Sequence, residues 1–147
     1  MLKTYKEPLS HELIKRYHYK LKSGVFENIA NGYPIGEYKN RRNIVSDITT
    51  ALPEDVHARM TALLDEYNAA DKHDLHGLAK FHADYEAIHP FQDGNRRTGR
   101  LILFKECLKN NIIPFVANDS HKAEYYHALN TAQIKQQLAQ FMPDQVI

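Results

Sequence analysis

Apolar side chains recur at helical spacing in four segments of the chain, and this periodicity constrains the fold more than any other feature of the sequence. Ser10 can cap the first segment, which runs to about Lys22. Pro53 suits the first turn of the second, where acidic residues follow it. The third runs from about residue 74 to 88, and we expect Asn95 to cap the fourth. The sequence therefore predicts a mostly α-helical fold.

No linker separates these segments, so the sequence predicts one domain over residues 1–147. Pro90 forbids continuation of the third helix, and the fourth is expected to end near Asn110. Two further helical stretches are expected at roughly 119–130 and 132–142, and no repeat, low-complexity tract or linker separates the segments. The apolar stripe expected on the second helix consists of Val56, Met60, Leu63, Leu64 and Tyr67.

Glycine and proline interrupt the helical pattern after the first segment. Two short extended stretches follow, at residues 35–39 and 43–48, with Asn40, Arg41 and Arg42 between them. This arrangement predicts a small β-hairpin over about residues 33–48. An isolated hairpin is marginally stable, so we expect it to pack against the helices.

Composition excludes several classes of function. The 147 residues carry a formal net charge of +1, which gives no overall attraction to nucleic acid or to an anionic membrane. No apolar run is long enough to span a bilayer, and residues 1–8 lack a hydrophobic signal-type core. The single cysteine, Cys107, lies in an apolar helical stretch and is expected to be buried. These features favour a cytoplasmic protein and are also compatible with a secreted effector.

The chemically informative groups lie between residues 89 and 100. His89 has an ordinary pKa near neutrality, which suits a general base that takes a proton from a hydroxyl. Asp93 lies beside cationic residues and should stay ionised, so it can hold Mg²⁺ while phosphate oxygens complete the metal's shell. Phe91 is unusual in a polar loop, and we expect its buried ring to anchor that loop.

The start of the fourth helix is suited to binding phosphate. Its first amides have no partner within the helix and carry partial positive charge. Gly94 lets the backbone approach a ligand closely. Arg97 and Arg100 share a helical face, and each guanidinium can take two phosphate oxygens. We therefore interpret residues 89–100 as the phosphate-handling site of a nucleotide-dependent transferase.

The same residues resemble the signature of Fic domains, His-Pro-Phe-x-(Asp/Glu)-Gly-Asn-Gly-Arg-x-x-Arg. Residues 34–39 resemble the family's flap hairpin, and residues 81–88 resemble the helix that leads into the motif. The likeness covers roughly residues 10–130, and so long a signature is specific. It implies a Fic-type helical bundle with a short β-hairpin flap. The matching motif positions are His89, Pro90, Phe91, Asp93, Gly94, Asn95, Arg97 and Arg100.

What the resemblance implies is transfer of AMP from ATP to a Ser, Thr or Tyr hydroxyl of a target protein. By that analogy His89 deprotonates the hydroxyl, and Asp93 binds Mg²⁺ on the α- and β-phosphates. The backbone of residues 94–96, which includes Gly94 and Asn95, forms the anion hole, whereas Arg97 and Arg100 hold the outer phosphates. The flap aligns a target segment by adding it as an edge strand. The flap residues are Ile35, Gly36, Glu37, Tyr38 and Lys39.

Arg96 departs from the family pattern, which has glycine at this position. It adds bulk and a fixed positive charge beside the expected phosphates. Three outcomes stay open: AMP transfer continues, the domain binds a nucleotide or partner but is catalytically impaired, or it transfers a phosphoryl group as the Doc-type relatives do. We rank them in that order.

Residues 23–28 match the inhibitory pattern of Fic proteins, (Ser/Thr)-x-x-x-Glu-(Gly/Asn), through Ser23 and Glu27. The corresponding hypothesis is that Glu27 pairs with Arg100 and keeps the γ-phosphate out. A chance match is the stronger interpretation, because the string is short and degenerate and Gly24 weakens any helix there. In that case an antitoxin-like partner or self-association would supply the inhibition.

A different enzyme class stays open in the histidines of the third helix. His73, His76 and His82, with Asp74 or Asp84, would suit a metal-dependent hydrolase. Their spacing does not bring them to one helical face, so we expect a partly buried His82 and exposed His73 and His76.

Overall fold

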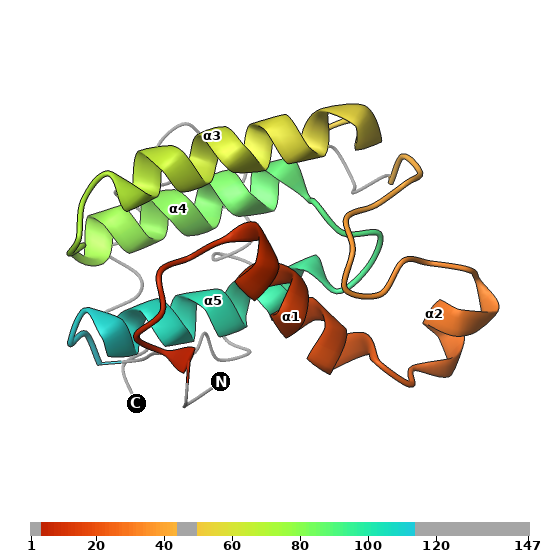
Figure 1. The fold of residues 1–147 in the computed structure, drawn as a ribbon, viewed down its shortest axis with the longest axis horizontal. Coiled ribbons are helices and arrows are strands. Elements are labelled where there is room, and N and C mark those ends of the chain that lie inside the picture. Colours follow the sequence, from red (N-terminus) through yellow and green to blue (C-terminus); the bar gives the residue numbers. More distant parts are fainter. Residues whose placement is uncertain (1–3, 44–49, 114–147) are drawn as a thin grey trace, which may run out of the picture.

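The described part of the chain, residues 4–43 and 50–113 of this computed structural model, is built from helices and contains no strand. The prediction of a mostly α-helical fold is therefore confirmed. Figure 1 shows α3 lying along α4, with α5 on the other side of α4 and α1 packed on α5. The main helices are α1 (His11–Lys22), α2 (Phe26–Ala30), α3 (Val56–Asn68), α4 (Leu75–Ile88) and α5 (Asn95–Lys109).

α1 begins where the sequence predicts. The Ser10 hydroxyl accepts a hydrogen bond from the Leu13 amide at 3.1 Å, which satisfies one of the free amides at the helix start. Besides its apolar face, α1 buries two polar side chains, His18 and Lys22. A buried charge needs a partner, so we expect a partner for Lys22 opposite the end of α1.

α3 and α4 pack side by side, and α5 packs on α4. Pro53 opens a 3-10 turn, η2 (Pro53–Asp55), that leads directly into α3. The carboxylate of Asp74 caps α4 by accepting the Gly77 amide at 2.9 Å. The buried residues of α3 are the predicted ones, Val56, Met60, Leu63, Leu64 and Tyr67.

The start of α5 differs from the prediction. Gly94 is the capping residue, with a left-handed φ of 81°, and Asn95 is the first residue of the helix. The Asn95 side chain accepts the Phe91 amide at 2.8 Å and donates to the Phe91 carbonyl at 2.7 Å. The expectation that Asn95 caps α5 was wrong, because the buried backbone of Phe91 takes both of its polar groups.

No strand of the expected β-hairpin is found in residues 33–43, which run as bends and extended chain. Residues 44–49, the other arm of the expected hairpin, lie outside the described residues. The backbone amides of this stretch bond elsewhere: Lys39 donates to the Pro90 carbonyl at 2.8 Å, and Gly36 donates to a ring nitrogen of His18 at 2.9 Å. We refer to residues 33–43 as the flap segment.

The exposure of the histidines in and just before α4 is partly as expected. His82 is 2 % exposed, and His76 is exposed. His73 was expected to be exposed but is half-buried, because its ring stacks on Tyr67 with 3.7 Å between centroids. No group of three metal-ligating side chains occurs among the described residues.

Cys107 is buried, as predicted. The helical stretches expected at 119–130 and 132–142 fall beyond the part of the chain that the structure describes. Among the helices that it does describe, none has the length and apolar character that a membrane crossing requires.

Candidate active site

A pocket of about 890 Å³ opens where α4 ends and α5 begins, beside the end of α1 and the short α2. Figure 1 shows these helix ends gathered at one end of the bundle. We refer to it as the motif pocket. Its lining residues are Lys22, Val25, Phe26, Glu27, Asn43, His89, Gln92, Asp93, Gly94, Asn95, Arg96 and Arg97.

His89 closes α4 at the wall of this pocket. It has left-handed backbone angles (φ 54°, ψ 62°), uncommon for a residue other than glycine. Burial lowers the pKa of its imidazole to about 4, and the positive charge of Lys39 contributes further. The ring is therefore neutral near pH 7 and able to accept a proton. A bound polyphosphate would raise this pKa, because anionic oxygens favour the imidazolium.

Asp93 reaches the pocket with both carboxylate oxygens engaged. Oδ1 accepts the Gly94 amide at 2.8 Å, and Oδ2 accepts Lys22 Nζ at 2.8 Å. The hydrogen bond from Lys22 is the main reason why the pKa of Asp93 is lowered. The carboxylate is thus ionised and half-exposed, which fits a Mg²⁺ ion that arrives on phosphates and needs a single protein carboxylate. Metal binding at Oδ2 requires Lys22 to move aside.

The N-terminus of α5 faces the same pocket. Its first helical hydrogen bond runs from the Thr98 amide to the Gly94 carbonyl, so the preceding amides have no acceptor within the helix. A side chain at Gly94 would place its Cβ 2.6 Å from Lys22 Cε, so Lys22 would have to shift to make room for it. Backbone amides and Arg97 therefore present positive charge to the pocket, whereas Arg100 is exposed and does not line it.

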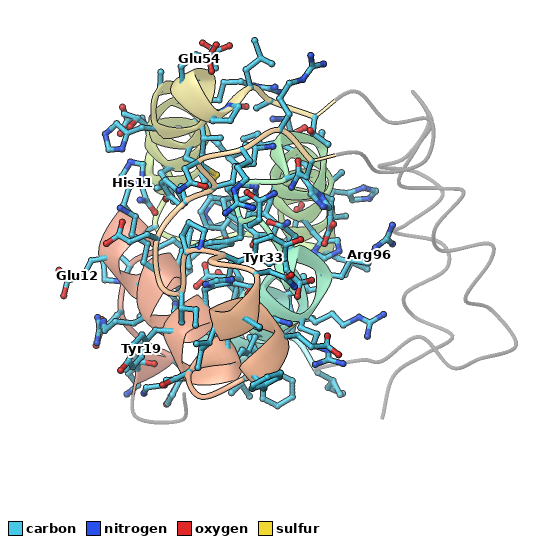
Figure 2. All side chains as sticks on the ribbon, turned by 90° about the vertical axis from the view of Figure 1, so that its right-hand side faces the viewer. His11, Glu12, Tyr19, Tyr33, Glu54 and Arg96 are labelled. Atoms are coloured by element: carbon cyan, nitrogen blue, oxygen red, sulfur yellow. The ribbon has the colours of Figure 1, made fainter. Side chains whose placement is uncertain are left out.

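Arg96 is half-buried between the motif pocket and the carboxylate of Glu86. Burial raises the pKa of Glu86 to about 7, and the positive charges of Arg96 and Arg100 oppose this increase. Figure 2 shows Arg96 on the opposite side of the molecule from His11 and Glu12 of α1. The side chain thus lies close enough to both the pocket and Glu86 for its charge to be felt at each.

The family model described as Fic/DOC family matches residues 8–106, about two thirds of the chain. The chain belongs to the Fic/DOC family. Protein adenylyltransferase Fic of Nematostella vectensis is 31% identical over 109 residues, which cover 71% of this chain and 26% of the relative. Protein adenylyltransferase fic-1 of Caenorhabditis elegans is 26% identical over 111 residues, covering 72% and 22%. The chain thus spans about a quarter of the length of these relatives.

Solved structures show the same fold. A Fic-domain-containing signaling protein from Bacteroides thetaiotaomicron has a TM-score of 0.79 at 23% identity, over 93% of this chain and 59% of that one. The N-terminal Fic domain of a Bartonella effector protein has a TM-score of 0.75 at 14% identity, over 99% and 76%. The helical bundle around the motif pocket is therefore a Fic fold.

The flap residues of this Fic domain divide into two groups. Ile35, Gly36 and Glu37 line a second, open groove of about 560 Å³ against α1. Tyr38 and Lys39 turn inward. The Tyr38 hydroxyl bonds His11 Nδ1 at 2.7 Å, while the 3 % exposed Lys39 donates to the side chains of Asn43 and Thr50. Only the first group lines this open groove.

The inhibitory pattern falls on two elements. Ser23 is the C-cap of α1, and Glu27 lies in the first turn of α2, so the string does not form one helix. Glu27 lines the motif pocket together with Arg96 and Arg97, but the residue proposed as its partner, Arg100, does not. The pairing of Glu27 with Arg100 stays a prediction.

Sequence reasoning missed three residues of the site: His18, Lys22 and Asn43. Each contacts the loop from far along the chain, since His18 bonds the Asp93 carbonyl at 2.8 Å and Asn43 donates to the Phe91 carbonyl at 2.9 Å. The one available signal was the helical register of His18 and Lys22, four residues apart on the inner face of α1.

Proposed function

We propose that this chain transfers AMP from ATP to a hydroxyl group of a target protein. The observation that carries the proposal is the motif pocket, in which a neutral imidazole, an ionised aspartate and the cationic start of α5 face one cavity. Relatives of this chain are named protein adenylyltransferases, which supports the same reaction.

In the proposed reaction, the hydroxyl oxygen of the target forms a bond to the α-phosphorus of ATP. The bond between that phosphorus and the bridging oxygen to the β-phosphate breaks, and pyrophosphate leaves. His89 accepts the hydroxyl proton. The amides at the start of α5, with Gly94 and Asn95, stabilise the charge that develops on the α-phosphate. Arg97, which lines the pocket, holds the outer phosphates, and Arg100 would have to turn toward them from outside the pocket lining.

Asp93 would hold Mg²⁺, which when bound neutralises phosphate charge and orients the leaving pyrophosphate. The groove beside Ile35, Gly36 and Glu37 would receive the target segment, whose backbone then pairs with the flap. The buried Lys39 takes no part in this docking and instead supports the loop from within.

The test uses the purified chain, Mg²⁺ and ATP labelled on either the α- or the γ-phosphate, with a protein extract as the source of targets. Incorporation of α-label into protein that is lost in His89→Ala supports AMP transfer. Incorporation of γ-label alone would instead establish the phosphoryl transfer seen in Doc-type relatives.

Arg96 favours a second candidate, a Fic domain that binds nucleotide without turnover, because its bulky cation lines the pocket where the family pattern has glycine. Arg96→Gly separates the two. If the natural chain is impaired, this variant gains α-label incorporation over wild type. If the natural chain is active, the variant changes incorporation little, because the anion hole is made of backbone amides.

Inhibition by Glu27 belongs to the same proposal. Glu27 lines the motif pocket together with Arg96 and Arg97, so its carboxylate would compete with phosphate oxygens for guanidinium groups. If Glu27 does not restrain the enzyme, an antitoxin-like partner is the remaining proposed source of control.

A further inference from the structure

One imidazole joins the flap segment to the loop that carries Asp93. His18 lies in α1 with no exposed surface, so its ring is held entirely by protein contacts. Its Nδ1 accepts the Gly36 amide at 2.9 Å, and its Nε2 bonds the Asp93 carbonyl at 2.8 Å. Its face stacks on Phe91, with 3.9 Å between ring centroids and 2° between planes.

The partners define which ring nitrogen carries the proton. An amide can only donate, so Nδ1 must be unprotonated; a carbonyl can only accept, so Nε2 must carry hydrogen. Each nitrogen of the neutral ring is therefore used once, by two backbone groups 57 residues apart in sequence, Gly36 and Asp93.

Both partners leave little freedom for adjustment. A side chain on Gly36 would place its Cβ 3.0 Å from the Cβ of Tyr19, so the flap backbone lies directly against α1 at this point. Asp93 is held on its other side by Lys22. The ring therefore sets the separation between the flap backbone and the loop backbone.

We propose that His18 is a positioning residue that places the flap segment and the Asp93 loop in register, so that the target hydroxyl and the α-phosphate meet. This inference rests on the proposed function for its consequence, but its geometry is testable without any transfer reaction. The flap is also tied to the loop by the Lys39 amide and by Asn43, so removal of one His18 bond should alter placement without releasing the flap.

Two substitutions cut the two bonds separately. In His18→Asn, the amide oxygen takes the place of Nδ1 and keeps the Gly36 bond, while the bond to Asp93 is lost. In His18→Gln, the amide nitrogen reaches the place of Nε2 and keeps the Asp93 bond, while the bond to Gly36 is lost. Both lose the stacking on Phe91 equally. His73→Asn, which removes a stacked ring remote from the pocket, is the matched control.

One hydrogen-exchange measurement and one binding measurement distinguish the flap side from the loop side. Amide hydrogen exchange at Gly36 should accelerate about fivefold or more in His18→Gln and stay near wild type in His18→Asn. The affinity for Mg²⁺ with an ATP analogue that cannot be cleaved between the α- and β-phosphates should fall about fivefold in His18→Asn and little in His18→Gln. Variants that shift both readouts together, or neither, would overturn the positioning role.

Nitrogen NMR of the natural chain tests the proposal even if the variants do not fold. The expected spectrum shows neutral His18 with hydrogen on Nε2 and a protected Gly36 amide; hydrogen on Nδ1 would overturn the proposal. Where AMP transfer is measurable, His18→Gln should raise KM for the target with little change in kcat. If the two variants differ in these readouts but the chain transfers no AMP, the proposed function is wrong and the positioning role is retained.

Discussion

Single residues at this site are constrained by contacts that the motif string does not reveal. Gly94 combines a left-handed backbone with the close approach of the Lys22 side chain. The side-chain amide of Asn95 forms both of its hydrogen bonds with the Phe91 backbone. Glu86 is buried, and burial raises its pKa. Loss of any one group therefore disturbs a neighbour that contacts the pocket.

Gly94→Ala should cost more than its backbone alone predicts. A left-handed alanine costs about 1–2 kcal/mol, and the new Cβ also forces Lys22 away from Asp93. Gly24→Ala is the matched control, because Gly24 has nearly the same φ (80°) and nothing within 4 Å of an added Cβ. Chemical denaturation should show a larger loss of unfolding free energy for Gly94→Ala. Equal losses would mean that Lys22 does not fill this space.

Glu86→Gln should change how stability depends on pH. The folded pKa of Glu86 is raised from 4.5 to about 7, so the folded state binds more protons than the unfolded state between these values, and stability falls as pH rises through them. Glutamine removes that loss. The variant should gain on the order of 2 kcal/mol relative to wild type between pH 4.5 and pH 8.

Unfolding free energies measured at the two pH values test this, with the exposed Glu54→Gln as control. A difference between Glu86→Gln and wild type that is the same at both pH values would contradict the role of burial.

Elements were predictable where local chemistry decides them. Ser10, Pro53 and the apolar stripe of α3 mark helices that the structure has. The conformation of residues 33–43 was not predictable from their extended-looking sequence, because the amides of Gly36 and Lys39 bond to α1 and to the motif loop. The cap of α5 was mispredicted for a related reason: a buried loop backbone took the Asn95 side chain.

Ser10→Ala should destabilise α1, the helix that carries His18 and Lys22 to the site. Loss of the bond to the Leu13 amide is expected to cost about 1 kcal/mol. Ser10→Asp keeps an acceptor at the cap and should retain most of the stability. Urea denaturation measures both variants, and equal losses in the two would show that the hydrogen-bond acceptor at the cap does not account for the stability.

Glu27→Gly tests whether α2 restrains the enzyme. Removal of a carboxylate that competes for the pocket arginines should raise α-label incorporation severalfold. Ala30→Gly, in the same short helix, weakens α2 without removing a charge and should leave incorporation unchanged. If the two variants behave alike, the inhibitory hypothesis fails.

In the whole molecule, the bundle brings His18 and Lys22 within reach of a loop more than 70 residues away in sequence. Periodicity predicted the helices, and the motif string predicted a site of which several residues, though not Arg100, line the pocket at the end of α4. Neither specifies which helix packs beside the loop. The contacts from α1 and the inward turn of Lys39 could therefore be identified only from the structure.

In the proposed reaction, the motif pocket holds a nucleoside triphosphate with its α-phosphate at the start of α5 and within reach of His89. A crystal structure with Mn²⁺ and an ATP analogue that cannot be cleaved between the α- and β-phosphates tests it most directly. We expect Mn²⁺ on Asp93, Lys22 turned away from that carboxylate, and the α-phosphate against the first amides of α5. A pocket closed by Arg96, or a nucleotide bound elsewhere with Lys22 still on Asp93, would contradict it.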